Sequence, residues 1–285
     1  MSFPYQHLAT VPESTIKSSK TTINIAGFHV HLYGVDELPE QHAKDTVVLF
    51  HVHGRTRSHK DGEMFAHQLL FQLKQREKLD RGFVVATFDT RNHGERKIDL
   101  LSVEDWKGGN QNHALDMLAM IDGNVADIQI VMKYLKAHVE GRFIPTEFIM
   151  TGFSLGGHTT WDTLASEPAV RAAVIIVGSP NLTDLLIERL GDKSVIESAK
   201  WPGSVSAMYR ARDQRLTTIT GKDILILNGA LDTLVPSKFT LPWVEKYGAY
   251  NDVSLKVFEN TGHWLSLEMI DTIVEWVLQK VFQAI

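Results

Sequence analysis

The sequence predicts an α/β protein built on one largely parallel sheet with helices on both faces. Two observations predict this class. Short strand-like runs alternate with longer helical runs along most of the 285 residues, an order typical of parallel sheets. One of these runs, residues 46–52, is continuously apolar, as expected for a strand that is buried on both faces of the sheet.

The first half of the chain opens with a hairpin. Residues 21–25 and 28–33 read as its two strands, and Ala26-Gly27 between them reads as the turn. Apolar residues then recur with strand or helix spacing. We expect strands over 46–52 and 83–88, and helices over 64–79 and 125–139. Residues 89–121 are left as a long connection after a strand.

The second half continues the alternation and interrupts it once. We expect strands over 148–151, 172–177, 224–227 and 253–258, and a last helix over 265–282. Residues 180–222 carry more helical pattern than one crossover between strands needs. The sequence therefore predicts one core domain formed by residues 1–179 and 223–285, with a small helical cap at residues 180–222 inserted in it.

Composition limits the classes of function. The chain is 44% hydrophobic, carries a net charge of −5 and has no long basic run, so nucleic acid is not an expected partner. It has no cysteine, which excludes disulfides, thiolate catalysis and cysteine-bound zinc. The sequence contains no run of about 18 apolar residues, so no membrane span is expected. The first residues lack the apolar stretch of a secretory signal, so a cytoplasmic location is expected.

The most specific motif is Gly152-Phe153-Ser154-Leu155-Gly156, which fits the pattern Gly-x-Ser-x-Gly. A strand-like run precedes it and a helix-compatible segment follows. This context belongs to a sharp turn that exposes a serine hydroxyl at the carboxyl edge of a sheet. Ser154 is therefore the candidate nucleophile.

A serine hydroxyl needs a base to accept its proton, and the base needs a group that orients it. Asp232 follows the strand-like run 224–227, and His263 follows the next one. Ends of parallel strands meet at one edge of a sheet, so we expect Ser154, Asp232 and His263 to lie together. Glu259 and Asp252 are the alternative acids.

Two backbone N–H groups are needed to stabilise the negative charge that develops on the substrate oxygen. Leu155, directly after the nucleophile, is expected to supply one. The loop after residues 46–52 contains His53-Gly54-Arg55, and Gly54 permits close approach of the backbone. We expect the Arg55 N–H to be the second donor.

Together these residues resemble the α/β-hydrolase superfamily. The resemblance rests on His53-Gly54, the segment 89–94 (Asp-Thr-Arg-Asn-His-Gly), the Ser154 turn, Asp232-Thr-Leu-Val-Pro236 and Gly262-His263-Trp264, and it covers nearly the whole chain. It implies the α/β-hydrolase fold with a mostly parallel eight-stranded sheet and a serine hydrolase that needs no cofactor and no metal. The single-domain esterases and the dienelactone-hydrolase and prolyl-oligopeptidase-like branches are the most similar.

Substrate contacts are harder to assign. Arg57 lies near the site, in a loop with Arg55, His59 and Lys60 that either binds an acidic group of the substrate or is simply solvated. The predicted cap raises the same question through its own basic residues, Lys200, Arg210, Arg212 and Arg215. Its apolar residues are expected either to wall an acyl pocket or to pack the cap onto the core; they are Trp201, Met208 and Tyr209.

The favoured function is cleavage of a carboxylic ester of a small molecule through an acyl-enzyme. Peptidases, thioesterases and carbon–carbon bond hydrolases share the machinery and stay open, as does a homodimer. Two other classes are disfavoured. A metallohydrolase would use His51, His53 and His59, but Asp61 is poorly placed to complete the ligand set. A non-catalytic binding protein of the same fold would not need all three catalytic groups.

Overall fold

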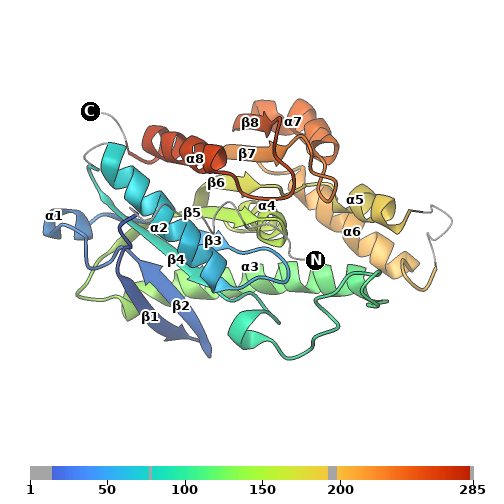
Figure 1. Cartoon of the computed structure of the whole chain (residues 1–285), viewed down its shortest axis with the longest axis horizontal. Helices are drawn as coiled ribbons and strands as arrows, with labels where there is room; N and C mark the ends of the chain where they lie inside the picture. The colour runs from blue at the N-terminus through green and yellow to red at the C-terminus, as the bar shows by residue number, and fades with distance from the viewer. Residues whose placement is uncertain (1–14, 77–78, 192–197, 283–285) are drawn as a thin grey trace.

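The computed structural model describes residues 15–76, 79–191 and 198–282, and joins its strands in one sheet (Figure 1). The strands are β1 Lys20–Ile25, β2 Phe28–Tyr33, β3 Thr46–Val52, β4 Gly82–Phe88, β5 Pro145–Phe153, β6 Val170–Ile176, β7 Asp223–Gly229 and β8 Asp252–Phe258. Their order is β1-β2-β4-β3-β5-β6-β7-β8. The hairpin β1–β2 and the pair β2–β4 are antiparallel, and all other pairs are parallel. The predicted mostly parallel eight-stranded sheet is confirmed.

The helices follow the predicted alternation with shifts at their ends. They are α1 Glu40–Ala43, α2 His59–Arg76, α3 His113–His138, α4 Leu155–Ser166, α5 Leu182–Leu190, α6 Gly203–Leu216, α7 Leu241–Tyr247 and α8 Leu267–Lys280. Two short helices, α1 and α7, were not predicted. The predicted helix over 64–79 starts earlier, and its residues 77–78 lie outside the described ranges.

The helix predicted over 125–139 begins at His113, so the expected long connection over 89–121 was wrong in its last part. Gly123 weakens the helical signal there, because glycine disfavours a helix interior. The structure shows which side chain occupies the space beside this glycine. A Cβ atom at position 123 would lie 2.5 Å from Cδ of Arg91, which packs against the helix.

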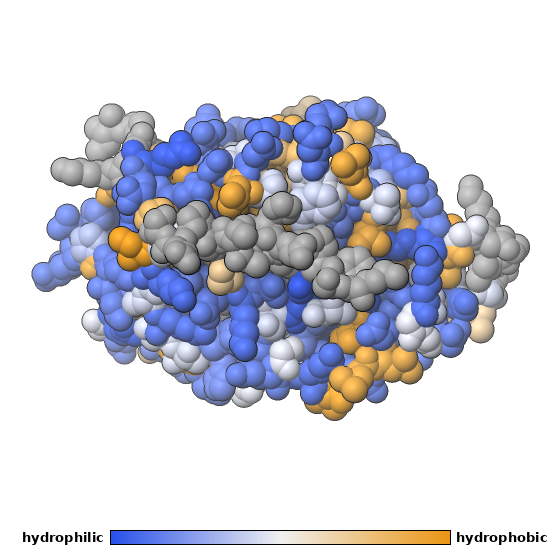
Figure 2. Space-filling view, viewed as in Figure 1, coloured by the Kyte–Doolittle hydropathy of each residue, from blue (hydrophilic) through white to orange (hydrophobic). Residues whose placement is uncertain are grey.

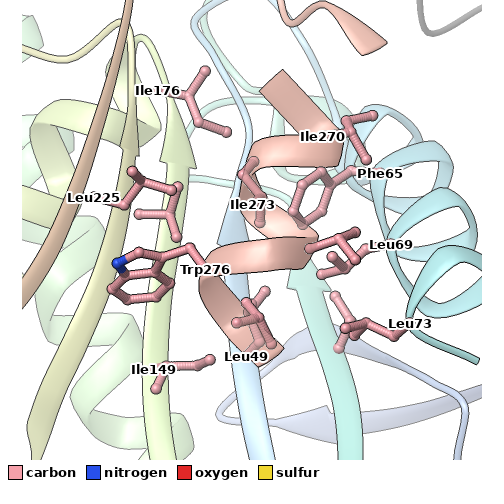
Figure 3. Packing of buried hydrophobic residues seen from close by; sticks show 14 of the residues in the cluster. Leu49, Phe65, Leu69, Leu73, Ile149, Ile176, Leu225, Ile270, Ile273 and Trp276 are labelled. Atoms are coloured by element: carbon pink, nitrogen blue, oxygen red, sulfur yellow. The ribbon is translucent and has the colours of Figure 1, made fainter. Parts of the chain in front are cut away.

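Helices α2 and α8 lie side by side on one face of the sheet (Figure 1). Figure 3 shows Phe65 and Leu69 of α2 and Ile273 of α8 packed over Leu49 and Leu225 of the strands. These five side chains are at most 2% exposed. Burying each one contributes roughly 1.5–3 kcal/mol before the cost of chain ordering is subtracted, so this layer holds β3 and β7 in place.

The opposite face is covered by α3 and α4. Trp161 of α4 is fully buried there, with its ring 4.6 Å from that of Trp243. Helix α4 follows directly from β5 and packs against β5 and β6, so its first turn is fixed at the carboxyl ends of the strands.

A third apolar cluster lies beyond the carboxyl ends of the strands. It joins Leu155 and the first turns of α3 to α5 and α6, the two helices of the segment 180–222 (Figure 1). Residues 192–197 of this segment lie outside the described ranges. The division into core and cap stays a prediction.

The face of the molecule drawn in Figure 2 is largely hydrophilic, with separate apolar patches. In the part of the chain that the structure describes, no helix is both long and apolar enough to cross a membrane.

Candidate active site

Ser154 lies at the tight turn between β5 and α4. Its φ of 55° and ψ of −110° are rare for a residue with a side chain, and such strain persists only where the surroundings enforce it. The two glycines that flank the turn show how the surroundings enforce these backbone angles. A Cβ atom at Gly152 would lie 2.1 Å from the carbonyl oxygen of Gly156, and one at Gly156 would lie 1.9 Å from that of Val52. The turn is closed on both sides by backbone, so the Ser154 side chain is forced out at the sheet edge.

The structure brings Ser154, His263 and Asp232 into one chain of hydrogen bonds. The Ser154 Oγ and His263 Nε2 atoms are 2.8 Å apart, and His263 Nδ1 lies 2.8 Å from Asp232 Oδ2. Since a carboxylate can only accept, His263 donates through Nδ1, and its Nε2 is left to accept the Ser154 hydroxyl proton. This is the arrangement in which an imidazole can take a proton from a serine.

Asp232 is held by the backbone of the loop that follows it as well as by the histidine. Its Oδ1 accepts hydrogen bonds from the N–H groups of Leu234 (2.8 Å) and Val235 (2.9 Å). Burial alone would raise the pKa of Asp232, but the hydrogen bonds from His263 and from these two amides lower it below its usual range. Asp232 is therefore a fixed anion against the imidazole. The alternative acids lie elsewhere, because Glu259 is exposed and Asp252 pairs with Lys280.

The loop after β3 is positioned by a buried neutral histidine. His53 Nδ1 donates to the carbonyl oxygen of Gly54 (2.8 Å), and Nε2 accepts from the N–H of Thr90 (3.0 Å). Burial lowers the pKa of His53 to about 3, so the ring stays neutral and can fill both roles. The bond to Thr90 ties the loop to the end of β4, which fixes the backbone at Arg55. Arg55 and Leu155, the predicted oxyanion donors, line the same cavity as Ser154.

Ser154 and His263 open into a cavity of about 650 Å³, a size ordinary for a small-molecule site. Arg57, which was predicted to contact the substrate, is part of its lining. Trp201 and Tyr209 are not among the lining residues that the structure describes. They are fully buried with their rings 4.9 Å apart, and the Tyr209 hydroxyl donates to the carbonyl oxygen of Ala114. Of the two roles left open for them, packing of the cap is the one these contacts support.

Met208 is 46% exposed and is likewise absent from the described lining. Two of the basic residues considered in the predicted cap bind a carboxylate of the core instead of facing the cavity. Arg212 and Arg215 both pair with the buried Asp162 of α4. An arginine of the segment 180–222 that does line the cavity is Arg189, in the last turn of α5.

Sequence reasoning missed Arg189 and a second part of the cavity wall. The missed wall residues come from the connection after β4 and from the start of α3; they are Glu104, Asp105, Trp106, Lys107 and His113. The only available signal was the length of the connection, which gives no direction for its side chains. No sequence signal marked Arg189, since a basic residue in the last turn of a helix is usual.

The histidines considered for a metal are engaged separately. His51 stacks on Phe65 with ring centroids 4.1 Å apart, His53 bonds the loop, and His59 Nδ1 lies 3.1 Å from Asp89 Oδ2. Across the described ranges, three or more histidine or carboxylate side chains nowhere gather as a metal site would need.

Known proteins match this chain in structure and not in sequence. No family model and no curated relative matches it. TT1662 from Thermus thermophilus matches with a TM-score of 0.65 and 20% identity, over 92% of this chain and 97% of its own. The esterase Pf2001 from Pyrococcus furiosus matches with a TM-score of 0.57 and 18% identity, over 100% and 98% of the two chains. The chain has the α/β-hydrolase fold.

A third match shows how far the fold alone reaches. The acylaminoacyl peptidase of Pyrococcus horikoshii matches with a TM-score of 0.65 and 12% identity, over 99% of this chain and 45% of its own. An esterase and a peptidase therefore share the fold, so the function of this chain has to be argued from its site.

Proposed function

We propose that this protein is a serine hydrolase that cleaves a carboxylic ester of a small molecule through an acyl-enzyme. The observation that carries the proposal is the hydrogen-bonded chain from Ser154 through His263 to Asp232 at the edge of the 650 Å³ cavity. Each member follows the end of a different strand: β5 before Ser154, β7 before Asp232 and β8 before His263.

In the first half of the reaction, Ser154 Oγ attacks the ester carbonyl carbon while its proton passes to His263 Nε2. Asp232 stabilises the imidazolium that forms. The N–H groups of Leu155 and Arg55 hold the oxyanion, each worth roughly 3 kcal/mol in such sites. The tetrahedral intermediate collapses, the C–O bond to the alcohol breaks, and His263 returns the proton to the leaving oxygen.

In the second half, water replaces the alcohol. His263 takes a proton from the water as its oxygen attacks the acyl carbon, and the same donors hold the second oxyanion. Collapse releases the carboxylic acid and returns the proton to Ser154 Oγ. Every proton that leaves one oxygen is delivered to another, so no cofactor is needed for this sequence.

The test is hydrolysis of short-chain esters such as p-nitrophenyl butyrate. Ser154→Ala removes the nucleophile and should lower kcat by roughly 10³-fold or more, since the triad acts as a unit. Ser204→Ala, an exposed serine on α6, is the matched control and should match the native protein. Circular dichroism should show that Ser154→Ala is folded. Activity of that variant within tenfold of the native rate would overturn the proposal.

A further inference from the structure

Two arginines from distant parts of the chain face the cavity that holds Ser154. Arg55 lies in the loop after β3, and Arg189 ends α5. Both side chains are half-buried. Arg55 Nη1 donates to the carbonyl oxygen of Val103 (2.5 Å), and Arg189 donates through Nε and Nη2 to that of Leu234 (3.1 and 2.5 Å). A guanidinium has five N–H groups, so each keeps donors that these carbonyls do not use.

Neither guanidinium has a carboxylate within 4.0 Å among the described residues. The acidic residues of the cavity wall do not form such an ion pair with either arginine. Glu188 pairs with Lys238 at 2.6 Å, and Asp105 accepts the N–H of Gly108. Glu104 and Asp105 act on Arg55 only as nearby charges.

The electrostatics of the pair favour an incoming anion. Burial and then the positive charge of Arg55 lower the pKa of Arg189 to about 10, while the charges of Asp232 and Asp105 act in the opposite direction. Burial also lowers the pKa of Arg55, and the charges of Asp105 and Glu104 offset only part of this effect. Both groups stay charged at neutral pH, so two like charges share a partly dry cavity. A negative group placed between them relieves this cost and uses their spare N–H groups.

We propose that Arg55 and Arg189 bind a carboxylate carried by the ester substrate. This inference rests on the proposed function and names its substrate class: small esters that bear a free carboxylate. A carboxylate suits the site because its two oxygens match the paired N–H groups of a guanidinium. Because both arginines line the cavity of Ser154, the carboxylate and the scissile ester belong to one small molecule.

The experiment compares acidic esters with neutral esters of similar size. One pair is monomethyl glutarate and methyl valerate, with the charge on the acyl side. The other is 4-carboxyphenyl butyrate and phenyl butyrate, with the charge on the alcohol side. The native protein should prefer one acidic ester by about tenfold or more in kcat/KM, the effect of one charge-assisted contact. Equal rates within both pairs would overturn the inference.

Arg189→Met separates substrate binding from support of the site. Its bonds to Leu234 steady the loop that carries Asp232, so a purely structural role would lower kcat for acidic and neutral esters alike. A binding role instead raises KM for the acidic ester and abolishes the preference, and Arg189→Lys should restore part of it. Arg210→Met, on the exposed side of α6, is the matched control and should keep the native preference.

Binding of glutarate gives a readout that does not need turnover. Calorimetry on Ser154→Ala should detect binding that weakens by about tenfold or more when Arg189→Met is added. Absence of binding at millimolar glutarate, or binding indifferent to Arg189, would contradict the inference. Hydrolysis of neutral esters that depends on Ser154 but shows no acidic preference would leave the proposed function standing. If the native protein hydrolysed none of these esters, the proposed function would fail, and with it the claim that the carboxylate belongs to an ester substrate, even if glutarate bound.

Discussion

The turn at Ser154 and the helices α5 and α6 are held in place by different forces. At the turn, backbone closes on backbone: Gly152 and Gly156 leave no room for a single added carbon. Helices α5 and α6 are held to the core by an apolar cluster and by charge, chiefly the ion pair between Arg212 and the fully buried Asp162 of α4 (2.7 Å).

The two regions need different precision in the positions of their atoms. A nucleophile must stay within a few tenths of an ångström of its base, and steric closure gives that precision. Apolar and ionic contacts hold α5 without such closure, so its side chains that line the cavity, Arg189 among them, can differ without disturbing the turn. In this molecule the two regions meet on α4, which begins at Leu155 and carries Asp162.

Gly156→Ala attacks the sterically closed region and should have the largest effect. The new Cβ would lie 1.9 Å from the carbonyl oxygen of Val52, which belongs to a central strand and cannot move away. We expect a loss of about 4 kcal/mol or more in the free energy of unfolding, or no folded protein. Gly203→Ala is the control, because nothing lies within 4 Å of its Cβ, and it should be neutral or slightly stabilising. Equal stability of the two variants in urea unfolding would refute steric closure.

Arg212→Met tests the charged anchor of α6. It leaves Asp162 buried beside Arg215 alone, and we expect a loss of about 3 kcal/mol. Arg215→Met, whose side chain is half exposed, should cost less than about 1 kcal/mol. Replacing Asp162 by Leu in the Arg212→Met protein should recover part of the loss, since the unpaired charge is then gone. Chemical denaturation measures all three, and equal effects of the two arginine variants would count against a buried anchor.

His51→Leu tests burial in β3, the strand whose Val52 closes the turn, and should have the smallest effect. The quantity measured is the change of stability with pH. Burial lowers the pKa of His51 to about 3, and neither ring nitrogen has a hydrogen-bond partner among the described residues. Below pH 6.5 the unfolded chain binds a proton at this histidine that the folded protein does not bind, so native stability falls as the pH falls toward 3.

The variant lacks that proton site, so its stability relative to the native protein should rise by about 2 kcal/mol between pH 6.5 and pH 5. Thermal and urea unfolding at a series of pH values provide the measurement. A stability difference that stays constant over this range would show that His51 is not a buried neutral group.

The same contrast explains what could be predicted from the sequence. Strands and the order Ser154, Asp232, His263 follow from local patterns, because apolar runs mark strands and each candidate group comes directly after one. The start of α3 could not be predicted, because Gly123 reads as a weak helix position until Arg91 is seen packed against it. Its role depends on a residue 32 positions away in the chain (123 − 91 = 32).

The directions of side chains in the predicted cap could not be predicted from the sequence for the same reason. Trp201 and Tyr209 are of the residue types that wall an acyl pocket, yet they lie fully buried in the third apolar cluster. Arg189 is one basic residue among several, and only its position next to the Ser154 cavity sets it apart. A sequence tells which residues are apolar or charged, but which surface a short inserted helix turns toward the site is decided by tertiary packing.

The central claim is that Ser154 is a nucleophile activated by His263, and labelling by a fluorophosphonate probe tests it most directly. The reagent reacts with serines that are activated in a folded site and not with ordinary hydroxyls. We predict stoichiometric labelling of the native protein, mapped by mass spectrometry to the peptide that contains Ser154, and none in Ser154→Ala or His263→Ala. Absence of labelling in the folded native protein, or labelling that survives Ser154→Ala, would contradict the account.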